Sequence, residues 1–190
     1  PHYLCDRILS FEVTSDNVRC ILQSHPENIR ERAFRTVIKN RMQRGGILAQ
    51  GASLVKSGEN GKGLRSRWYP ETLVKRIRLI HEHRHRLQFC QEDGLRIINK
   101  YRRRARAAFF VDPPYTAGGK KAGSRLYTFS DIDHGKLFAA MAKVEGAFLM
   151  TYDESQEVRE LASRQEFVVD SLPMKNTHHA LNYELLISRA

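Results

Sequence analysis

Apolar and polar residues follow two different rhythms along the chain, and the change falls near residue 87. Before it, apolar residues recur at helical spacing over 26–44 and again from Pro70 to about Arg86, which predicts two helices with basic outer faces. The stretch between them, 45–68, is rich in glycine, serine and lysine. It predicts a long loop, or a hairpin that turns at Asn60-Gly61.

Beyond residue 87, short apolar runs alternate with helical stretches, which is typical of an α/β fold. The runs predict strands at 87–90, 107–111, 147–150, 166–171 and 183–189. Helices are predicted at 94–104, 131–144 and 154–164. Continuous apolar runs indicate strands buried on both faces, so we expect a parallel or mostly parallel sheet covered by helices. The last two strands have no helix between them and are expected to form an antiparallel hairpin at the sheet edge.

Composition indicates a soluble globular protein. The 190 residues are 41% hydrophobic and 28% charged, which suits one domain or one domain with an inserted lobe. Three cysteines without CxxC spacing argue against a disulfide framework or a cysteine-rich zinc site, and favour a reducing cytosol. No apolar run reaches the ~20 residues that a membrane span needs, so no membrane partner is expected.

The positive charge is concentrated in one part of the chain. The formal net charge is +11, but residues 30–125 hold 24 Lys and Arg against 7 Asp and Glu, or +17, which leaves −6 for the rest. A basic surface attracts a polyanion such as nucleic acid, because binding releases condensed counterions. The alternative is a set of solvated helix faces.

Candidate chemistry follows the strand predicted at 107–111. Asp112-Pro113-Pro114-Tyr115 places an acid, two rigid prolines and an aromatic ring at the carboxyl end of that strand, where open α/β sheets bind ligands. Proline fixes its own backbone angles and restricts the residue before it. We therefore expect the carboxylate, the carbonyls and the ring to project in set directions.

With this motif the chain resembles the Dam-type, DPPY-containing family of DNA adenine-N6 methyltransferases. The resemblance spans about residues 30–190. It is further supported by Phe34 through Asn40-Arg41 with the glycine-rich loop, Leu126-Tyr127, Phe148 through Asp153, Lys175-Asn176-Thr177 and Tyr183 through Ile187. It implies a Rossmann-like methyltransferase sheet with an inserted helical target-recognition lobe, S-adenosylmethionine as cofactor, and double-stranded DNA as substrate in a bacterial or phage-type, nucleoid-associated setting.

The resemblance also implies roles for single residues. Asp112 and the Pro113 carbonyl would accept the hydrogens of the adenine amine, Tyr115 would stack on the flipped base, and Pro114 would complete the rigid turn. Asp93, Phe110 and Asp112 would contact the cofactor. No metal is needed, and the tract of His81, His83 and His85 is interpreted as part of a solvated basic helix.

One family feature is missing from the printed sequence, namely the glycine-rich cofactor loop after the first strand and the acidic residue on the next. The chain starts at Pro1 and not at Met, so we expect a fragment or a processed product. A preceding segment or a second chain is expected to supply the missing part of the cofactor pocket.

The charge and the resemblance together predict three segments. These are an N-terminal segment at 1–25, a basic target-recognition lobe at 26–86 and a catalytic α/β methyltransferase region at 87–190. The residues expected to contact DNA are Arg41, Arg44, Lys62, Arg65, Arg67, Lys120, Lys121 and Lys175. Two alternatives stay open: a catalytically silent DNA-binding subunit of a split methyltransferase, and an amino methyltransferase that acts on RNA or on cytosine N4.

Overall fold

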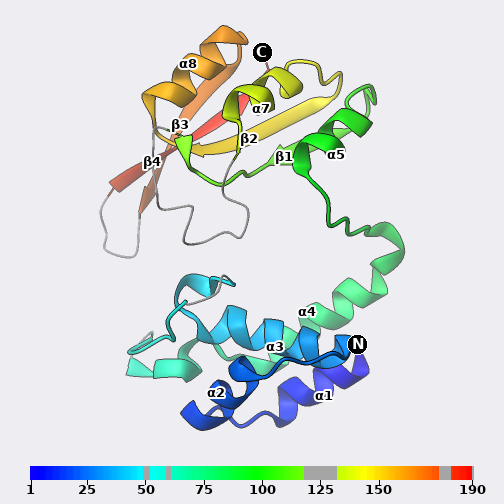
Figure 1. Ribbon diagram of the computed structural model, residues 1–190, viewed down its shortest axis with the longest axis vertical. Coiled ribbons are helices and arrows are strands. Elements are labelled where there is room, and N and C mark those ends of the chain that lie inside the picture. Colours follow the sequence, from blue (N-terminus) through cyan, green and yellow to red (C-terminus); the bar gives the residue numbers. More distant parts are fainter. Residues whose placement is uncertain (49–51, 59–60, 118–131, 176–180, 190) are drawn as a thin grey trace. The chain divides into compact units, whose positions relative to one another are not determined.

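The computed structural model of the chain describes residues 1–48, 52–58, 61–117, 132–175 and 181–189 (Figure 1). The chain divides into two compact units, Pro1–Phe89 and Cys90–Ala190, and each has its own hydrophobic core. Some of the sequence-based predictions fall outside the described residues. These are Asn60 of the predicted turn, Lys120 and Lys121, Leu126-Tyr127, Asn176-Thr177 and the side chain of Lys175.

The N-terminal unit is helical. Its α-helices are α1 (His2–Ser10), α2 (Ser15–Gln23), α3 (Ile29–Met42) and α4 (Pro70–Glu82). Short 3-10 turns lie at η1 (Arg44–Gly46), η3 (Gly63–Arg67) and η4 (Arg84–Arg86). Both predicted helices are confirmed as α3 and α4, although α4 ends before Arg86. Across the described ranges, no helix is both long enough and apolar enough to span a membrane.

Local sequence signals explain where these helices begin. Thr14 and Asn28 cap α2 and α3 by accepting hydrogen bonds from backbone N–H groups in the first turn, and Pro70 occupies the first position of α4. Inside the unit, Phe34 is fully buried and meets the ring of Phe11 edge-on at 5.3 Å between centroids. The helices therefore pack around one aromatic and aliphatic core.

The segment predicted as a loop, 45–68, runs back along the end of α3. Arg44 N donates to Ser53 O at 2.8 Å, and Val55 N donates to Met42 O at 2.8 Å. Gly58 is required in this turn, because its φ is +63° and a Cβ there would overlap the Gly63 carbonyl. Gly58 thus lets the described part of this segment fold tightly on itself.

The C-terminal unit combines helices and strands as the sequence predicts. Its elements in chain order are α5 (Gly94–Tyr101), β1 (Ala108–Val111), α7 (His134–Met141), β2 (Ala147–Asp153), α8 (Gln156–Arg164), β3 (Val168–Lys175) and β4 (Leu181–Ser188). The unit is therefore mixed α/β. The final hairpin is confirmed, because β3 and β4 pair antiparallel with β3 at the edge.

The prediction of a parallel or mostly parallel sheet is wrong. The four strands lie in the order β1-β2-β4-β3, and only β1 and β2 pair in parallel. Because β3 and β4 form a hairpin and β4 inserts next to β2, β4 runs antiparallel to both of its neighbours. A hairpin needs only a short connection, whereas a parallel pair needs a crossover such as α7.

The expectation that helices cover the sheet on both faces is also wrong for the described residues. Helices α5, α7 and α8 pack on one face (Figure 1), where Phe148, Met150 and Tyr152 are buried. On the opposite face Phe110 is 69% exposed and Leu172 is 44% exposed. An apolar run shows that residues on both sides of a strand are hydrophobic, but it does not show that something covers both sides.

The predicted strand at 87–90 does not form. Residues 87–90 have no regular structure, and Phe89 is 89% exposed. A strand exists only when a neighbouring strand satisfies its backbone hydrogen bonds. Within the described part of the chain, the partner of β1 is β2 and no strand pairs with 87–90.

Candidate active site

Three strands bring polar side chains together at one end of the sheet, where β1 and β2 have their carboxyl ends. Because β1 and β2 are parallel, their carboxyl ends meet there, so Asp112 follows β1 beside Thr151 near the end of β2. Strand β4 runs the other way and begins at the same edge, where Glu184 lies opposite Asp153. The topology thus gathers residues that are far apart in the sequence.

Asp112 is exposed but held by two hydroxyl groups. Thr151 Oγ1 donates to Asp112 Oδ1 at 2.9 Å, and the Tyr115 hydroxyl lies 2.9 Å from the same oxygen. Both contacts fall on Oδ1, so Oδ2 is the oxygen that can receive a further donor. The carboxylate is therefore oriented before any ligand binds.

Tyr115 is anchored at both ends of its side chain. Its hydroxyl lies 2.7 Å from Glu184 Oε1 as well as 2.9 Å from Asp112 Oδ1. Its ring stacks against Tyr152 at 6.0 Å between centroids and 29° between planes. Burial, together with the hydrogen bonds to Glu184 and Asp112, raises the pKa of Tyr115, so the phenol keeps its proton. Since Tyr152 backs one face of the ring, the other face is the one that a planar ligand could use.

The two prolines form the turn that carries Asp112 and Tyr115. Pro113 is buried, and Thr116 N donates to the Pro114 carbonyl at 2.9 Å. Among the described residues no backbone N–H donates to the Pro113 carbonyl. That carbonyl is therefore an acceptor without a backbone donor, next to the carboxylate of Asp112.

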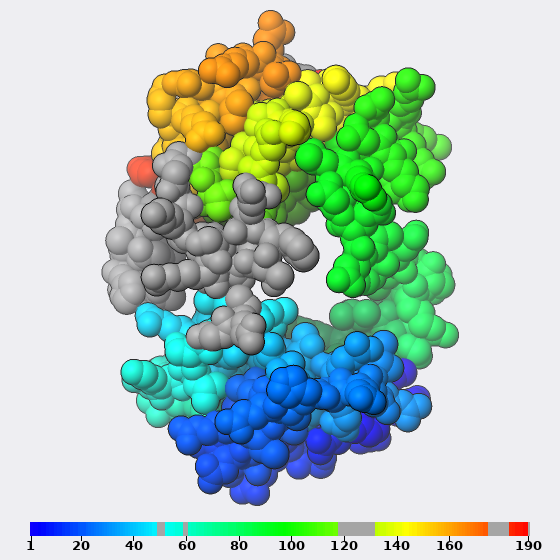
Figure 2. Space-filling view, viewed as in Figure 1, coloured from blue at the N-terminus to red at the C-terminus, as the bar shows by residue number. Residues whose placement is uncertain are grey.

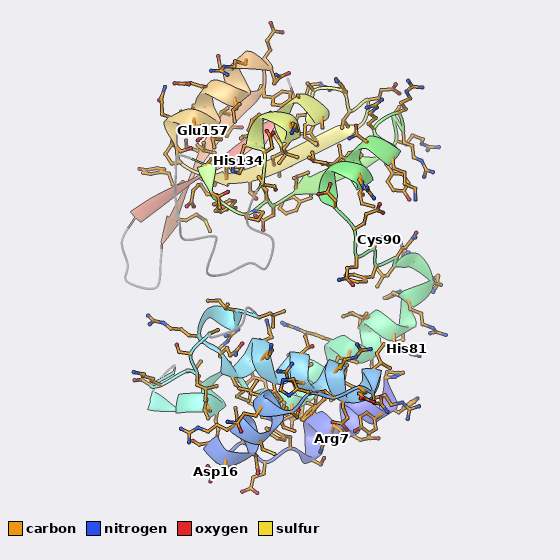
Figure 3. The ribbon with its side chains drawn as sticks, in the orientation of Figure 1. Arg7, Asp16, His81, Cys90, His134 and Glu157 are labelled. Carbon is orange, nitrogen blue, oxygen red and sulfur yellow. The ribbon has the colours of Figure 1, made fainter. Side chains whose placement is uncertain are left out.

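A second hydrogen-bonded group lies beneath this turn. His134 is only 7% exposed, and its ring nitrogens lie 3.0 Å from the Thr116 and Tyr152 hydroxyls. Burial lowers the pKa of His134, while Glu157, shown near it in Figure 3, acts in the opposite direction. The neutral imidazole of His134 therefore links Thr116, the residue after Tyr115, to Tyr152, the ring on which Tyr115 stacks.

Sequence reasoning found the motif but not its supporting residues. Thr151, Glu184 and His134 carry no local signal for these contacts, although Thr151 and Glu184 lie in segments that support the family resemblance. Asp133, beside His134, does cap α7, since its carboxylate accepts from Lys136 N at 2.8 Å. A search for polar residues at the ends of neighbouring strands could have suggested Thr151.

The three residues predicted to contact a cofactor lie at different distances along the chain from the site. Asp112 lies in the site, and the exposed ring of Phe110 is two residues away on β1. Asp93 is the N-cap of α5, and its carboxylate accepts from Arg96 N at 3.1 Å. The exposed Phe110 ring could stack on an adenine, and the carboxylates of Asp93 and Asp112 could accept hydrogen bonds. These three side chains therefore suit part of S-adenosylmethionine.

The basic residues predicted to contact DNA lie in the N-terminal unit, and they differ in exposure. Arg44, Lys62 and Arg65 are exposed, and the segment around η3, drawn in cyan, lies at the surface in Figure 2. Arg67 is half-buried and donates to the Gln43 carbonyl at 3.3 Å, so it also holds the loop. Arg41 is half-buried as well, and its Nε is buried without a hydrogen-bond partner.

Arg41 belongs to a cluster of like charges. Burial lowers the pKa of Arg41, and the neighbouring Arg67 and Arg76 lower it further. Among the described residues no ion pair joins any of these three arginines to an acid. Neighbouring cations that have no acidic partner among the described residues favour binding of an anion.

An open groove continues this basic surface. It measures about 640 Å³ and lies between the start of α2 and the loop before α4. Four of its lining residues are cationic, namely Arg19, Lys56, Lys62 and Arg65, and none of its described lining residues is acidic. The charge of these lining residues therefore favours an anionic ligand such as a phosphate.

Comparisons with protein-family models and with curated protein sequences found no match to this chain.

Proposed function

We propose that this chain is the catalytic region of a DNA adenine-N6 methyltransferase that uses S-adenosylmethionine. The observation that carries the proposal is the rigid turn at the carboxyl edge of the sheet, which holds the Asp112 carboxylate, the Pro113 carbonyl and the Tyr115 ring together. The Rossmann-like methyltransferase sheet belongs to the same proposal, and the mixed α/β fold is compatible with it.

The two acceptors suit an exocyclic amine. The nitrogen lone pair of such an amine is delocalised into the base, so the amine is a poor nucleophile until its hydrogens are held and the nitrogen becomes pyramidal. Asp112 Oδ2 and the Pro113 carbonyl oxygen can each accept one of the two hydrogens. Thr151 keeps the carboxylate in position while this happens.

Tyr115 would receive the flipped base on its free face. Stacking on an aromatic side chain contributes about 1–3 kcal/mol per base, which helps to offset the loss of stacking in the duplex. The Tyr152 ring supports Tyr115 from behind, and the hydroxyl contacts keep it from rotating. The ring would therefore be ready before the base arrives.

The cofactor would supply a methyl group bound to a positively charged sulfur. Phe110 would stack on its adenine, Asp93 would accept a hydrogen bond from that adenine, and Asp112 would lie near the sulfur's positive charge. A segment outside the described residues or a second chain would hold the remainder, as the family resemblance implies.

The basic surface of the N-terminal unit would bind the DNA backbone. Arg44, Lys62 and Arg65 are exposed, and the arginine cluster around Arg41 has no acidic partner among the described residues. Phosphates would neutralise these charges and release counterions. Lys120, Lys121 and Lys175 stay predictions for DNA contact.

Methyl transfer tests the enzymatic part of the proposal. Genomic DNA is incubated with tritiated S-adenosylmethionine and with the chain, together with the segment or second chain that completes the cofactor pocket. The DNA is then digested to nucleosides, which are separated. We expect label in N6-methyladenine, and loss of that label in Asp112→Ala with DNA affinity retained. Asp170→Ala, which removes an exposed carboxylate on β3, is the matched control and should stay active. An active Asp112→Ala would refute the mechanism.

Salt dependence tests the DNA-binding part. Replacing Arg44, Lys62 and Arg65 together by glutamine should flatten the slope of log affinity against log salt by about one unit for each phosphate that is no longer neutralised. The control carries the same charge change on exposed residues of the C-terminal unit, namely Arg96, Lys143 and Arg164. Equal slopes in both triple variants would mean that the surface is only solvated.

Two other functions give different results in the same assays. A catalytically silent DNA-binding subunit would bind duplex with the same salt slope but would not bind S-adenosylmethionine in calorimetry. An enzyme that acts on cytosine N4 would place the label in N4-methylcytosine. An enzyme that acts on RNA would leave genomic DNA unlabelled and would label ribonucleosides when RNA is supplied in its place. The distribution of label among nucleosides therefore decides between the substrates.

A further inference from the structure

The hydroxyl of Tyr115 lies between two carboxylates that come from different parts of the chain. Asp112 Oδ1 is 2.9 Å away on one side, and Glu184 Oε1 is 2.7 Å away on the other. Thr151 Oγ1 makes a third close contact, at 2.9 Å from Asp112 Oδ1. All three oxygen–oxygen distances are those of O–H···O hydrogen bonds.

This network has more contacts than hydrogens. The three contacts need three hydrogens, and the hydroxyls of Tyr115 and Thr151 supply two when both carboxylates are ionised. If Tyr115 donates to Glu184 and Thr151 donates to Asp112, then the contact between Asp112 and Tyr115 has none. One added proton on Asp112 completes the network, because Asp112 can then donate to the Tyr115 oxygen.

Two other carboxylate side chains lie near Glu184. Asp153 on β2 is the cross-strand neighbour of Glu184, and facing positions on paired strands project to the same side of the sheet. On the other side of β4, Leu172 of β3 faces Glu184. Asp112 at the end of β1 is joined to Glu184 through the Tyr115 hydroxyl.

Methylation of an amine releases one proton. The nitrogen forms a bond to the methyl carbon while the carbon–sulfur bond breaks and sulfur keeps the electron pair. The nitrogen then carries a positive charge and loses a hydrogen as a proton. Asp112 is the carboxylate that would hold that hydrogen, so it is the first acceptor.

We infer that Asp112, Tyr115 and Glu184 form a proton relay that ends on Glu184, an inference that rests on the proposed function. The amine hydrogen arrives on Asp112 Oδ2, and rotation of the carboxyl group about its Cβ–Cγ bond exchanges the two oxygens, so that the protonated oxygen faces Tyr115. Asp112 then gives this hydrogen to the Tyr115 oxygen while the Tyr115 hydrogen passes to Glu184 Oε1. Tyr115 is neutral before and after the step, Asp112 regains its charge, and Glu184 loses its charge. The relay needs no oxidant, reductant or further reactant.

Glutamine at position 184 separates this role from a structural one. The amide oxygen of Glu184→Gln can still accept the Tyr115 hydrogen bond, but the amide does not take up a proton. Glu184→Ala loses both abilities. A residue that only fixes the ring would therefore tolerate glutamine, whereas the end of a relay would not.

The first measurement uses the full chain without cofactor. The carbon-13 resonance of the phenolic carbon of Tyr115, assigned with Tyr115→Phe, reports its hydrogen bonds. We expect Glu184→Ala and Asp112→Ala each to shift this resonance, and Glu184→Gln to shift it less than Glu184→Ala. No shift in Glu184→Ala would show that the hydroxyl is not shared, and would overturn the relay without any assay of activity.

The second measurement is single-turnover methylation of duplex DNA. We expect Glu184→Gln to slow transfer by about tenfold or more with DNA affinity unchanged, in line with the contribution of a positioned proton acceptor. Tyr115→Phe should also slow transfer, because it removes the bridging hydroxyl and keeps the ring. If the wild type is active and Glu184→Gln methylates DNA at the same rate, then the relay is overturned and the proposed function stands. A wild type that binds S-adenosylmethionine and duplex DNA but methylates no nucleoside overturns the proposed function, and the relay with it.

Discussion

The buried imidazole of His134 should make the stability of the C-terminal unit depend on pH. Burial lowers the pKa of His134 in the folded chain, whereas the unfolded chain has the ordinary value of about 6.5. The unfolded chain therefore binds the proton first as pH falls. Stability is complete above the unfolded pKa and is lost as pH drops from there toward the folded pKa.

The size of this pH effect follows from the uptake of one proton by His134 in the unfolded chain. His134 is 7% exposed and both ring nitrogens have hydroxyl partners, so little solvent reaches the ring. If the folded imidazole stays neutral, then the loss between pH 7.5 and pH 5.5 is at most about 1.4 kcal/mol. Glu157 and Asp133 favour the protonated form and therefore reduce this loss.

The assay compares wild type with His134→Asn. The reporter is hydrogen exchange of peptides from β2, expressed as protection factors so that the intrinsic pH dependence of exchange cancels. We expect protection in the wild type to fall more steeply between pH 7.5 and pH 5.5 than in the variant. His85→Asn, which changes an exposed histidine of the other unit, should follow the wild type. Parallel curves for wild type and His134→Asn would refute the reasoning.

Three further predictions concern stability, measured by the same exchange protection in the C-terminal unit. Gly146→Ala should destabilise by about 1–3 kcal/mol, because the new Cβ would overlap the Ala107 carbonyl; unchanged protection would contradict that crowding. Leu185→Ala, at a fully buried position, should cost about 2–5 kcal/mol, whereas the half-exposed Leu172→Ala should cost far less, and equal costs would contradict the assigned faces of the sheet. Ser155→Ala should cost about 0.5–2 kcal/mol, since the Ser155 side chain accepts from Val158 N at the start of α8, and Ser155→Asp should retain most of the stability.

The sequence by itself determined the local elements and the candidate motif. Helical spacing located α3 and α4, with Pro70 marking the start of α4, and apolar runs located β1 and β2 to within a few residues. These features depend on neighbours a few positions apart, which a sequence shows directly. The four residues from Asp112 to Tyr115 were found for the same reason, because their chemistry is contiguous.

Only the tertiary structure decided how the elements pair and what surrounds the motif. The insertion of β4 beside β2, the exposed apolar residues on one face of the sheet and the irregular structure of 87–90 all depend on which partners are present, and no local pattern encodes that. Tyr115 and Glu184 are 69 residues apart in sequence, yet 2.7 Å separates their oxygens. Glu184 alternates with buried apolar residues along β4 and looks like any outward strand residue. Its place between Tyr115 and Asp153 comes from the register of β4 against β2, and that register is fixed by burial of Leu185 and Ile187 on the opposite face.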